Sequence, residues 1–232
     1  MEVSWLEQSL ADVSSDDVWL SDSERLHCSS LRVPKRRADW RLGRWTAKHA
    51  VASRLDLSNN SATLATIEIR PDASGAPEVF SNDRPARVCI SISHSAGVAA
   101  CAVGPAGAAV GCDLERIEPR DPSFIADYFT AGEQEMISRA GKSERDTLIT
   151  LLWSAKESAL KTLRTGLRLD TRSVAGKISE DASVTANIWV PLSVCCPADK
   201  ILRGWWSCSG EMVRTIVTVP SFGPPVVMGV RS

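Results

Sequence analysis

The residues from Val88 to Cys112 include no Asp, Glu, Lys or Arg, and this run most constrains how the chain can fold. The run is long enough to cross a bilayer as one helix. Its middle, however, carries serines and a histidine, and Gly104-Pro105 breaks it further on. The alternation in "VCISISHS" and the break favour two buried β-strands joined by a turn. We therefore expect no membrane-spanning segment in this chain.

Two carboxylates, Asp113 and Glu115, follow directly where the apolar run ends. Side chains two residues apart in an extended chain point to the same side, so the two carboxylates should project together. Close carboxylates repel each other, and a divalent cation relieves that repulsion. Oxygen-only ligation favours Mg²⁺ or Mn²⁺ over zinc. The alternative is that Asp113 and Glu115 form the solvated start of a loop.

About forty residues later, "LLWSAKESALK" has the periodicity of a helix buried on one side. Glu157 and Lys161 are four residues apart and therefore share one helical face, and Lys156 lies next to them around the axis. This pattern places a third carboxylate and two ammonium groups on one helix. The alternative is a surface ion pair that contributes only a few tenths of a kcal/mol, roughly 0.2–0.5.

The order of helical and extended segments predicts an α+β fold made of two similar halves, a pseudo-dimer. Each half should contain a small antiparallel sheet packed with helices. We expect an N-terminal half over residues 1–116 and a C-terminal half over residues 117–232. The halves show no obvious sequence repeat, so this prediction rests on the order of the elements.

Composition excludes several classes of protein. The formal net charge of −1 argues against a general nucleic-acid or membrane binder. Seven scattered cysteines, with no CxxC pair, indicate reduced thiols in a cytoplasmic protein, and no zinc-site pattern is present. The acidic N-terminus lacks the order of a signal peptide. Positive charge is concentrated in residues 32–54, which suits an anionic ligand or a solvated helix face. The bases of that block are Arg32, Lys35, Arg36, Arg37, Arg41, Arg44, Lys48 and Arg54.

Taken together, these motifs resemble the signature of the 4′-phosphopantetheinyl transferases. "VGCDLE" followed by "WSAKESALK" resembles the two main motifs, "SISHS" resembles the serine-histidine-serine segment, and "YFTAGEQEMI" resembles the aromatic pair followed by a glutamate. The chain length resembles that of the larger, monomeric, pseudo-dimeric (Sfp-like) subfamily. The resemblance implies Mg-dependent transfer of the 4′-phosphopantetheine arm of coenzyme A to a conserved serine of an apo acyl or peptidyl carrier protein. The second product would be adenosine 3′,5′-bisphosphate.

The resemblance also assigns roles to residues. Asp113, Glu115 and Glu157 would ligate Mg²⁺, with Mn²⁺ as a substitute. Glu157, Lys161 and Asp113 would be catalytic: Glu157 takes the proton of the carrier serine, and Lys161 faces the developing phosphate charge. Coenzyme A would be bound by residues from the basic helix, the serine-histidine segment and the second motif. These are Arg36, Arg37, Arg41, Arg44, Ser93, His94, Lys156 and Lys161.

One departure leaves an alternative open. Relatives often carry a lysine before the proline of a "GKP" turn, whereas this chain has Ala76 in "SGAPEVF". A non-catalytic coenzyme A-binding homologue is therefore the main alternative. A hydrolase that uses His94 with Ser93 or Ser95 is a weaker one, because no GxSxG elbow is present. An excess of basic residues over 139–177 suits an acidic carrier protein, and Arg164 and Arg168 are its candidate contacts.

Overall fold

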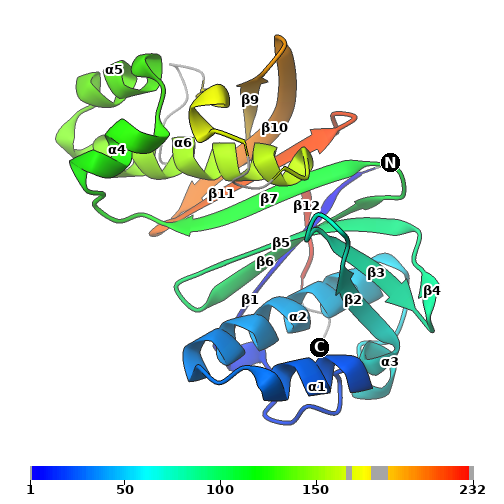
Figure 1. The fold of residues 1–232 in the computed structure, drawn as a ribbon. Helices are drawn as coiled ribbons and strands as arrows, with labels where there is room; N and C mark the ends of the chain where they lie inside the picture. Colours follow the sequence, from blue (N-terminus) through cyan, green and yellow to red (C-terminus); the bar gives the residue numbers. More distant parts are fainter. Residues whose placement is uncertain (1, 166–168, 179–187, 230–232) are drawn as a thin grey trace. The chain divides into compact units, whose positions relative to one another are not determined.

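A computed structural model of the chain describes residues 2–165, 169–178 and 188–229 (Figure 1). The chain divides into two compact units. Unit 1 comprises residues 1–108 and 226–232, and unit 2 comprises residues 109–225. Each unit combines helices with an antiparallel sheet, so the predicted α+β class with two similar halves is confirmed. Among the described helices, none has both the length and the apolar composition of a membrane span.

Unit 1 packs a long helix, α2, against the strands β1 and β6 (Figure 1). Its main sheet has the order β12-β1-β6-β5, and a smaller sheet has the order β2-β3-β4. The helix begins at a proline, which suits the first helical turn because its missing N–H would have no partner there. The elements are β1 (Ser4–Ser9), α1 (Asp22–Ser30), α2 (Pro34–Arg54), α3 (Ser61–Thr66), β2 (Ile67–Pro71), β3 (Pro77–Ser81), β4 (Arg84–Pro85), β5 (Val88–Ser95), β6 (Val98–Pro105) and β12 (Val226–Val227).

Unit 2 repeats this plan with a second long helix, α6, which packs against the strands β7 and β11. Its sheet has the order β7-β11-β10-β9-β8. In both units the first strand pairs with the second strand of a hairpin: β1 with β6, and β7 with β11. The elements are β7 (Ala109–Arg116), α4 (Pro122–Tyr128), α5 (Ala131–Arg139), α6 (Lys142–Thr162), β8 (Ala175–Lys177), β9 (Val190–Cys196), β10 (Lys200–Ser209) and β11 (Met212–Val219).

The structure differs from the expected division of the chain in two ways. β7 belongs to unit 2, because it pairs along its whole length with β11, so unit 2 begins at Ala109 and not at residue 117. The last strand, β12, belongs to unit 1, because it pairs in parallel with β1 and does not extend the sheet of the C-terminal half. The helix end expected at Gly166 and the first part of the segment "VTANIWV" lie outside the described residues.

A buried lysine and glutamate form the same network in each unit. In unit 1, Lys48 of α2 is fully buried and contacts Glu24 and the carbonyl oxygens of Trp19 and Leu64. Glu24 also caps α1 as the fourth residue of a capping box and accepts a hydrogen bond from the backbone N–H of Ile69 in β2. Both charges are therefore satisfied inside the core of unit 1.

The equivalent network in unit 2 joins Lys156 of α6 to Glu133 of α5. Lys156 is fully buried and contacts Glu133 and the carbonyl oxygens of Thr171 and Val174. Glu133 completes the capping box of α5 and accepts a hydrogen bond from the backbone N–H of Gly176 in β8. We call the two networks the Glu24–Lys48 clamp and the Glu133–Lys156 clamp.

The two clamps reveal a sequence repeat between the halves. Lys48 and Lys156 occupy the same position along helices that are both 21 residues long. Aligning them places "WTAKHAVASRL" (45–55) over "WSAKESALKTL" (153–163). Trp, Ala, Lys and Leu recur at matched positions of this alignment, and Thr46 aligns with Ser154. The chain thus carries an internal duplication that its few identities conceal.

Candidate functional site

Asp113 and Lys161 form the central contact of the candidate site in unit 2. Asp113 lies on β7 and is 3% exposed. Lys161, in the last turn of α6, donates to Asp113 Oδ1 at 2.9 Å and to the carbonyl oxygen of Cys112 at 2.9 Å. The carboxylate beside it raises the pKa of Lys161, although burial alone would lower it. Lys161 is therefore a fixed positive charge beside β7.

A glycine allows α6 to approach β7 this closely. A Cβ atom at Gly111 would lie 2.0 Å from the carbonyl oxygen of Ser158 and 2.5 Å from Thr162 Oγ1. Helix and strand backbones therefore meet two residues before Asp113. This close packing positions the end of α6 relative to the carboxylates of β7.

Glu115 and Glu157 complete the group of predicted site carboxylates, and both have raised pKa values. Burial, followed by the charge of Asp113, raises the pKa of Glu115 to about 7. Burial also raises the pKa of Glu157, and the charge of Asp113 adds to the effect while Lys161 opposes it. Asp113 is thus close enough to Glu115 and to Glu157 to raise the pKa of each, as like charges in a partly buried site do.

Arg120, which the sequence motifs did not single out, and Trp153 both interact with the carboxylate of Glu115. Arg120, which follows β7, lies 3.6 Å from Glu115 Oε2 and 3.1 Å from Glu118. Arg120 and a hydrogen bond from Trp153 of α6 both lower the pKa of Glu115, which partly offsets burial. The sequence signal that could have predicted the contact between Arg120 and Glu115 was their short separation along the chain.

The chemistry of this group fits a hard divalent cation, but the group does not form a closed ligand set. Three carboxylates supply oxygen donors, and ionising them together needs a compensating positive charge. Among the residues that the structure describes, no group of three or more His, Cys, Asp or Glu side chains is close enough to form a metal site by itself. Mg²⁺ commonly takes only one or two protein carboxylates and fills its shell with water and phosphate oxygens. The assignment of Asp113, Glu115 and Glu157 as metal ligands remains a prediction.

Lys156 has a structural role that differs from the predicted contact with coenzyme A. Its three N–H donors match three acceptors inside unit 2: Glu133 and the carbonyl oxygens of Thr171 and Val174. Its side chain is fully buried. Lys156 is adjacent to Glu157 in sequence, but it points into the core of the unit.

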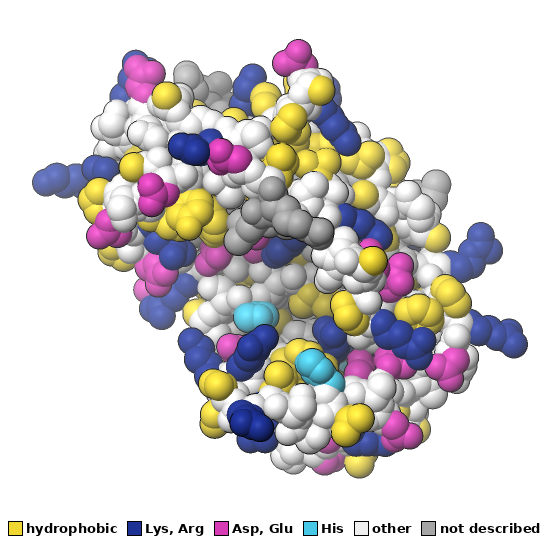
Figure 2. Space-filling model, viewed as in Figure 1, with side chains coloured by type: hydrophobic (Ala, Val, Ile, Leu, Met, Phe, Trp, Pro, Cys, Tyr) yellow, Lys and Arg dark blue, Asp and Glu magenta, His cyan; other side chains and the backbone are white. Residues whose placement is uncertain are grey.

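Unit 1 contributes an open pocket of about 450 Å³ at the start of α2. His94, at the end of β5, and Arg36 both line it, so two of the predicted coenzyme A contacts lie together. On the face drawn in Figure 2, histidine side chains lie beside Lys and Arg side chains. The residues that line the pocket are Val33, Lys35, Arg36, Asp39, Trp40 and His94. Sequence reasoning missed Lys35 and Trp40 as pocket residues, because Lys35 was one of many bases and a tryptophan on a helix gives no signal of a pocket by itself.

The other predicted contacts of unit 1 lie elsewhere. Arg41 donates to the carbonyl oxygens of Ser14 and Asp16 and forms an ion pair with Asp17, so it anchors the N-terminal loop. Arg44 lies 3.7 Å from Glu24 and stacks over the ring of Trp40.

Arg37 and Ser93 are also outside the described lining of the pocket. Arg37 is exposed on α2, whereas Ser93 is 8% exposed in β5. The basic block therefore includes residues that line the pocket, residues that contact other parts of unit 1, and the exposed Arg37.

Comparisons with known proteins agree with this arrangement of motifs. The family model of the 4′-phosphopantetheinyl transferase superfamily matches residues 109–196. This range includes the carboxylate–lysine group of unit 2, which consists of Asp113, Glu115, Glu157 and Lys161. The chain is 29% identical over 98 residues to 4′-phosphopantetheinyl transferase psf-1 of Bacillus pumilus. It is 32% identical over 84 residues to the holo-[acyl-carrier-protein] synthase of Streptococcus agalactiae.

These matches cover parts of each protein. The match to psf-1 spans 42% of this chain and 41% of that protein, and the match to the synthase spans 36% of this chain and 71% of that protein. A crystal structure of a holo-(acyl-carrier-protein) synthase from Bacillus anthracis in complex with coenzyme A (3′,5′-ADP) covers 44% of this chain and 92% of its own, with a TM-score of 0.36 and 22% identity. The chain belongs to the 4′-phosphopantetheinyl transferase superfamily.

Proposed function

We propose that this protein is a 4′-phosphopantetheinyl transferase that moves the phosphopantetheine arm of coenzyme A onto a serine of an apo carrier protein. The observation that carries the proposal is the group formed by Asp113, Glu115, Glu157 and Lys161 inside the region that matches the family. Pyrophosphate chemistry requires positive charge beside negative oxygens, and this group offers one ammonium and a place for a divalent cation.

In the proposed transfer, one bond to phosphorus forms and another breaks. The serine oxygen of the carrier forms a bond to the phosphorus that carries the pantetheine arm. The bond from that phosphorus to the bridging oxygen breaks, and adenosine 3′,5′-bisphosphate leaves. Glu157 takes the serine proton, and its raised pKa makes it a better base near neutral pH. Lys161 stabilises the charge that develops on the phosphate oxygens. A bound Mg²⁺, held by Asp113, Glu115 and Glu157, would neutralise the pyrophosphate.

In unit 1, the pocket at the start of α2 is the proposed site for the negative end of coenzyme A. Lys35 and Arg36 offer positive charge for a phosphate, and His94 offers a ring N–H. Trp40 offers an aromatic face. Alanine variants of Arg36 and His94 should raise the KM for coenzyme A much more than they lower kcat. Arg84→Ala, a change at an exposed arginine in β4 outside the pocket lining, is the matched control.

The proposed protein partner is an acidic acyl or peptidyl carrier protein, and no nucleic-acid or membrane partner is proposed. The basic segment 139–177 supports this partner only in part. Lys156 is buried, Arg139 pairs with Glu135, and Arg172 pairs with Asp170. Arg168 lies outside the described residues. Arg164 is exposed, and Arg164→Glu should raise the KM for the carrier at low salt.

We also propose that the protein acts as a monomer in the cytoplasm. All seven cysteines are free thiols, which suits a reducing compartment. Light scattering of the purified protein tests the monomer directly, and a dimer at micromolar concentration would contradict it.

The decisive experiment is the intact mass of an apo carrier protein after incubation with this protein, coenzyme A and Mg²⁺. The expected gain is about 340 Da, the mass of one phosphopantetheine arm under this transfer chemistry. The gain should disappear with Glu157→Gln and without metal. Glu144→Gln, an exposed glutamate at the other end of α6, is the matched control and should retain the gain.

The alternative of a non-catalytic coenzyme A-binding homologue predicts a different pattern. Coenzyme A would bind to the wild type, as measured by calorimetry, while no carrier gained mass. Ala76, in place of the lysine frequent in relatives, is the observation in favour of this alternative.

A further inference from the structure

Unit 1 contains a small cavity whose lining repeats, position by position, the candidate site of unit 2. Leu6 and Gln8 are alternate residues of β1, and His49 and Ser53 are four residues apart on α2. In unit 2, Asp113 and Glu115 are alternate residues of β7, and Glu157 and Lys161 are four residues apart on α6.

The repeat "WTAKHAVASRL" and "WSAKESALKTL" fixes the helical half of this correspondence. It places His49 over Glu157 and Ser53 over Lys161. Each pair of helical residues then faces the first strand of its own unit, where the matched residues are Leu6 for Asp113 and Gln8 for Glu115. The cavity of unit 1 is therefore the counterpart of the carboxylate–lysine group.

The chemical character of the two copies is opposite. Where unit 2 has three carboxylates and an ammonium, unit 1 has leucine, an amide, an imidazole and a hydroxyl. Burial lowers the pKa of His49, which keeps its ring neutral near pH 7. A small site with no charged side chain offers neither the carboxylates that usually hold a divalent cation nor the cationic groups that usually hold a phosphate. The ligand of this cavity should therefore be neutral and polar.

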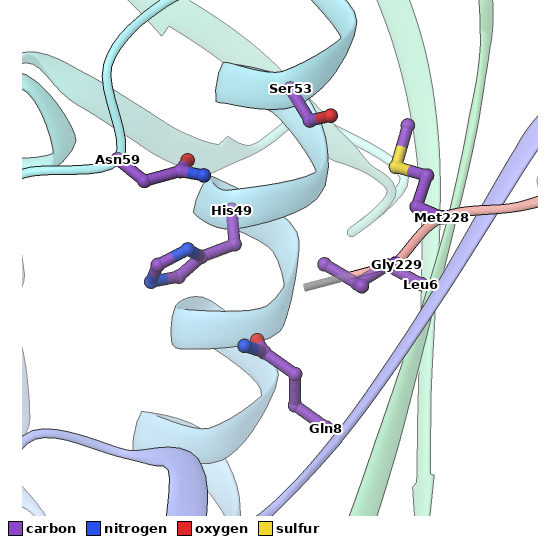
Figure 3. Close-up of a pocket in the computed structure, with 7 residues that line it drawn as sticks. All are labelled: Leu6, Gln8, His49, Ser53, Asn59, Met228 and Gly229. Atoms are coloured by element: carbon purple, nitrogen blue, oxygen red, sulfur yellow. The ribbon is translucent and has the colours of Figure 1, made fainter. Parts of the chain in front are cut away.

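Three buried polar atoms around the cavity have no hydrogen-bond partner among the described residues. They are Gln8 Oε1, His49 Nε2 and Asn59 Oδ1. Gln8 is only 4% exposed. Figure 3 shows that Gln8 comes from β1, His49 from α2 and Asn59 from the loop after α2, with their polar ends near the same stretch of helix. A buried polar atom that stays unsatisfied destabilises the fold, so a hydrogen-bond partner for each of the three is favoured.

The size of the cavity selects the ligand. Its volume is about 10 Å³, which is close to the smallest space that accepts one water molecule. Buried waters typically make about three hydrogen bonds. A water molecule can donate to amide oxygens and can accept from, or donate to, a ring nitrogen, and these are the kinds of unpartnered atom on the residues that line the cavity.

We propose that unit 1 holds an uncharged second copy of the site, and that this copy binds one ordered water through Gln8, His49 and Asn59. The chain then has one charged copy and one neutral copy of the same arrangement. This inference goes beyond the proposed transfer reaction and does not depend on it.

A high-resolution crystal structure of the full chain, soaked with Mn²⁺, tests the proposal. We expect a single density peak in the cavity at about 2.7–3.2 Å from at least two of the three atoms, and no anomalous manganese signal there. Gln8→Leu should remove the peak by deleting an acceptor and filling space. Ser53→Ala, which changes the lining without touching the three atoms, should keep it. Asn59→Ala, in a loop, provides a second loss variant if Gln8→Leu does not fold.

Several outcomes would overturn the proposal. An empty cavity in the wild type, direct hydrogen bonds among the three side chains, or manganese in the cavity would each contradict a bound water. A peak that persists unchanged in both loss variants would show that these side chains do not hold it. Manganese at Asp113 is a separate result, since it bears on the proposed function and leaves the water site unaffected.

Discussion

Lys161 Nζ lies 2.9 Å from Asp113 Oδ1, so the last turn of α6 and the strand β7 are joined by an ion pair between two predicted catalytic residues. Asp113 is buried, whereas the side chain of Lys161 is 29% exposed. Two of the three N–H donors of Lys161 are used by Asp113 and Cys112 among the described residues. The pair thus holds an oriented and partly exposed ammonium beside β7.

Lys161→Met should lower kcat for carrier modification by about 10²–10³, the loss typical when one stabilising donor is removed from a transition state. Steady-state kinetics with a fixed apo carrier protein measures this loss. Lys142→Met, at the exposed start of the same helix, should leave kcat unchanged. A Lys161→Met enzyme with the kcat of the wild type would exclude this role for the ammonium.

Gly111→Ala should lower both activity and stability, because the new methyl group would overlap the carbonyl oxygen of Ser158. Either α6 or β7 must shift, and the shift separates Lys161 from Asp113. Urea unfolding and the mass-gain assay measure the two effects. Gly132→Ala is the control: nothing lies within 4 Å of its added Cβ in the first turn of α5, and it should stabilise the protein by about 0.5–1 kcal/mol.

Lys156→Met should destabilise the protein by about 3–5 kcal/mol, because it leaves the carboxylate of Glu133 buried without its counter-charge. The double variant Glu133→Gln with Lys156→Met should cost far less than the sum of the single changes. A double-mutant cycle by urea unfolding tests this coupling. Additive effects would show that the two residues do not act as one clamp.

The unfolding free energy should fall more steeply on acidification in the wild type than in His49→Gln. Burial lowers the pKa of His49 below its ordinary value of 6.5, so the unfolded chain binds this proton more readily than the folded one. The contribution is therefore fully present above about pH 6.5 and is lost as the pH falls. Urea titrations at about pH 7 and about pH 5 measure the two slopes.

Ser53→Ala, which changes no titratable group on the same helix, is the control for the slope comparison. It should unfold with the same pH dependence as the wild type. Parallel slopes for wild type and His49→Gln would contradict a neutral His49 in the folded protein.

Local patterns predicted much of the fold. The alternation in "VCISISHS" placed β5, and the 3.6-residue periodicity placed α2 and α6. Those signals depend only on neighbouring residues. The pairing of β12 with β1 joins opposite ends of the chain and leaves no such signal, so the tail was assigned to the wrong sheet.

The site was predicted in the same uneven way. The spacing of Asp113, Glu115, Glu157 and Lys161 indicated a shared location, and the structure brings Asp113 and Lys161 into direct contact. The sequence could not predict which basic residues line the pocket and which bind buried glutamates, because tertiary packing decides which of them are buried. Lys156 and Arg44 carry the same charge as Arg36, but tertiary packing turns them toward buried glutamates. The repeat was overlooked because it becomes visible only when Lys48 and Lys156 are aligned.

The return of β12 to β1 has a consequence for how the chain is made. Val226 and Met228 donate backbone hydrogen bonds to Val3 and Trp5, so the edge of the first strand is completed by residues that are translated after the whole of unit 2. Domains usually fold as units while the ribosome is still working, and the N-terminal one folds first. Here residues 109–225 can form their sheet while unit 1 still lacks a strand. Unit 1 therefore starts to be synthesised before unit 2 but acquires its β12 strand only after unit 2 is complete.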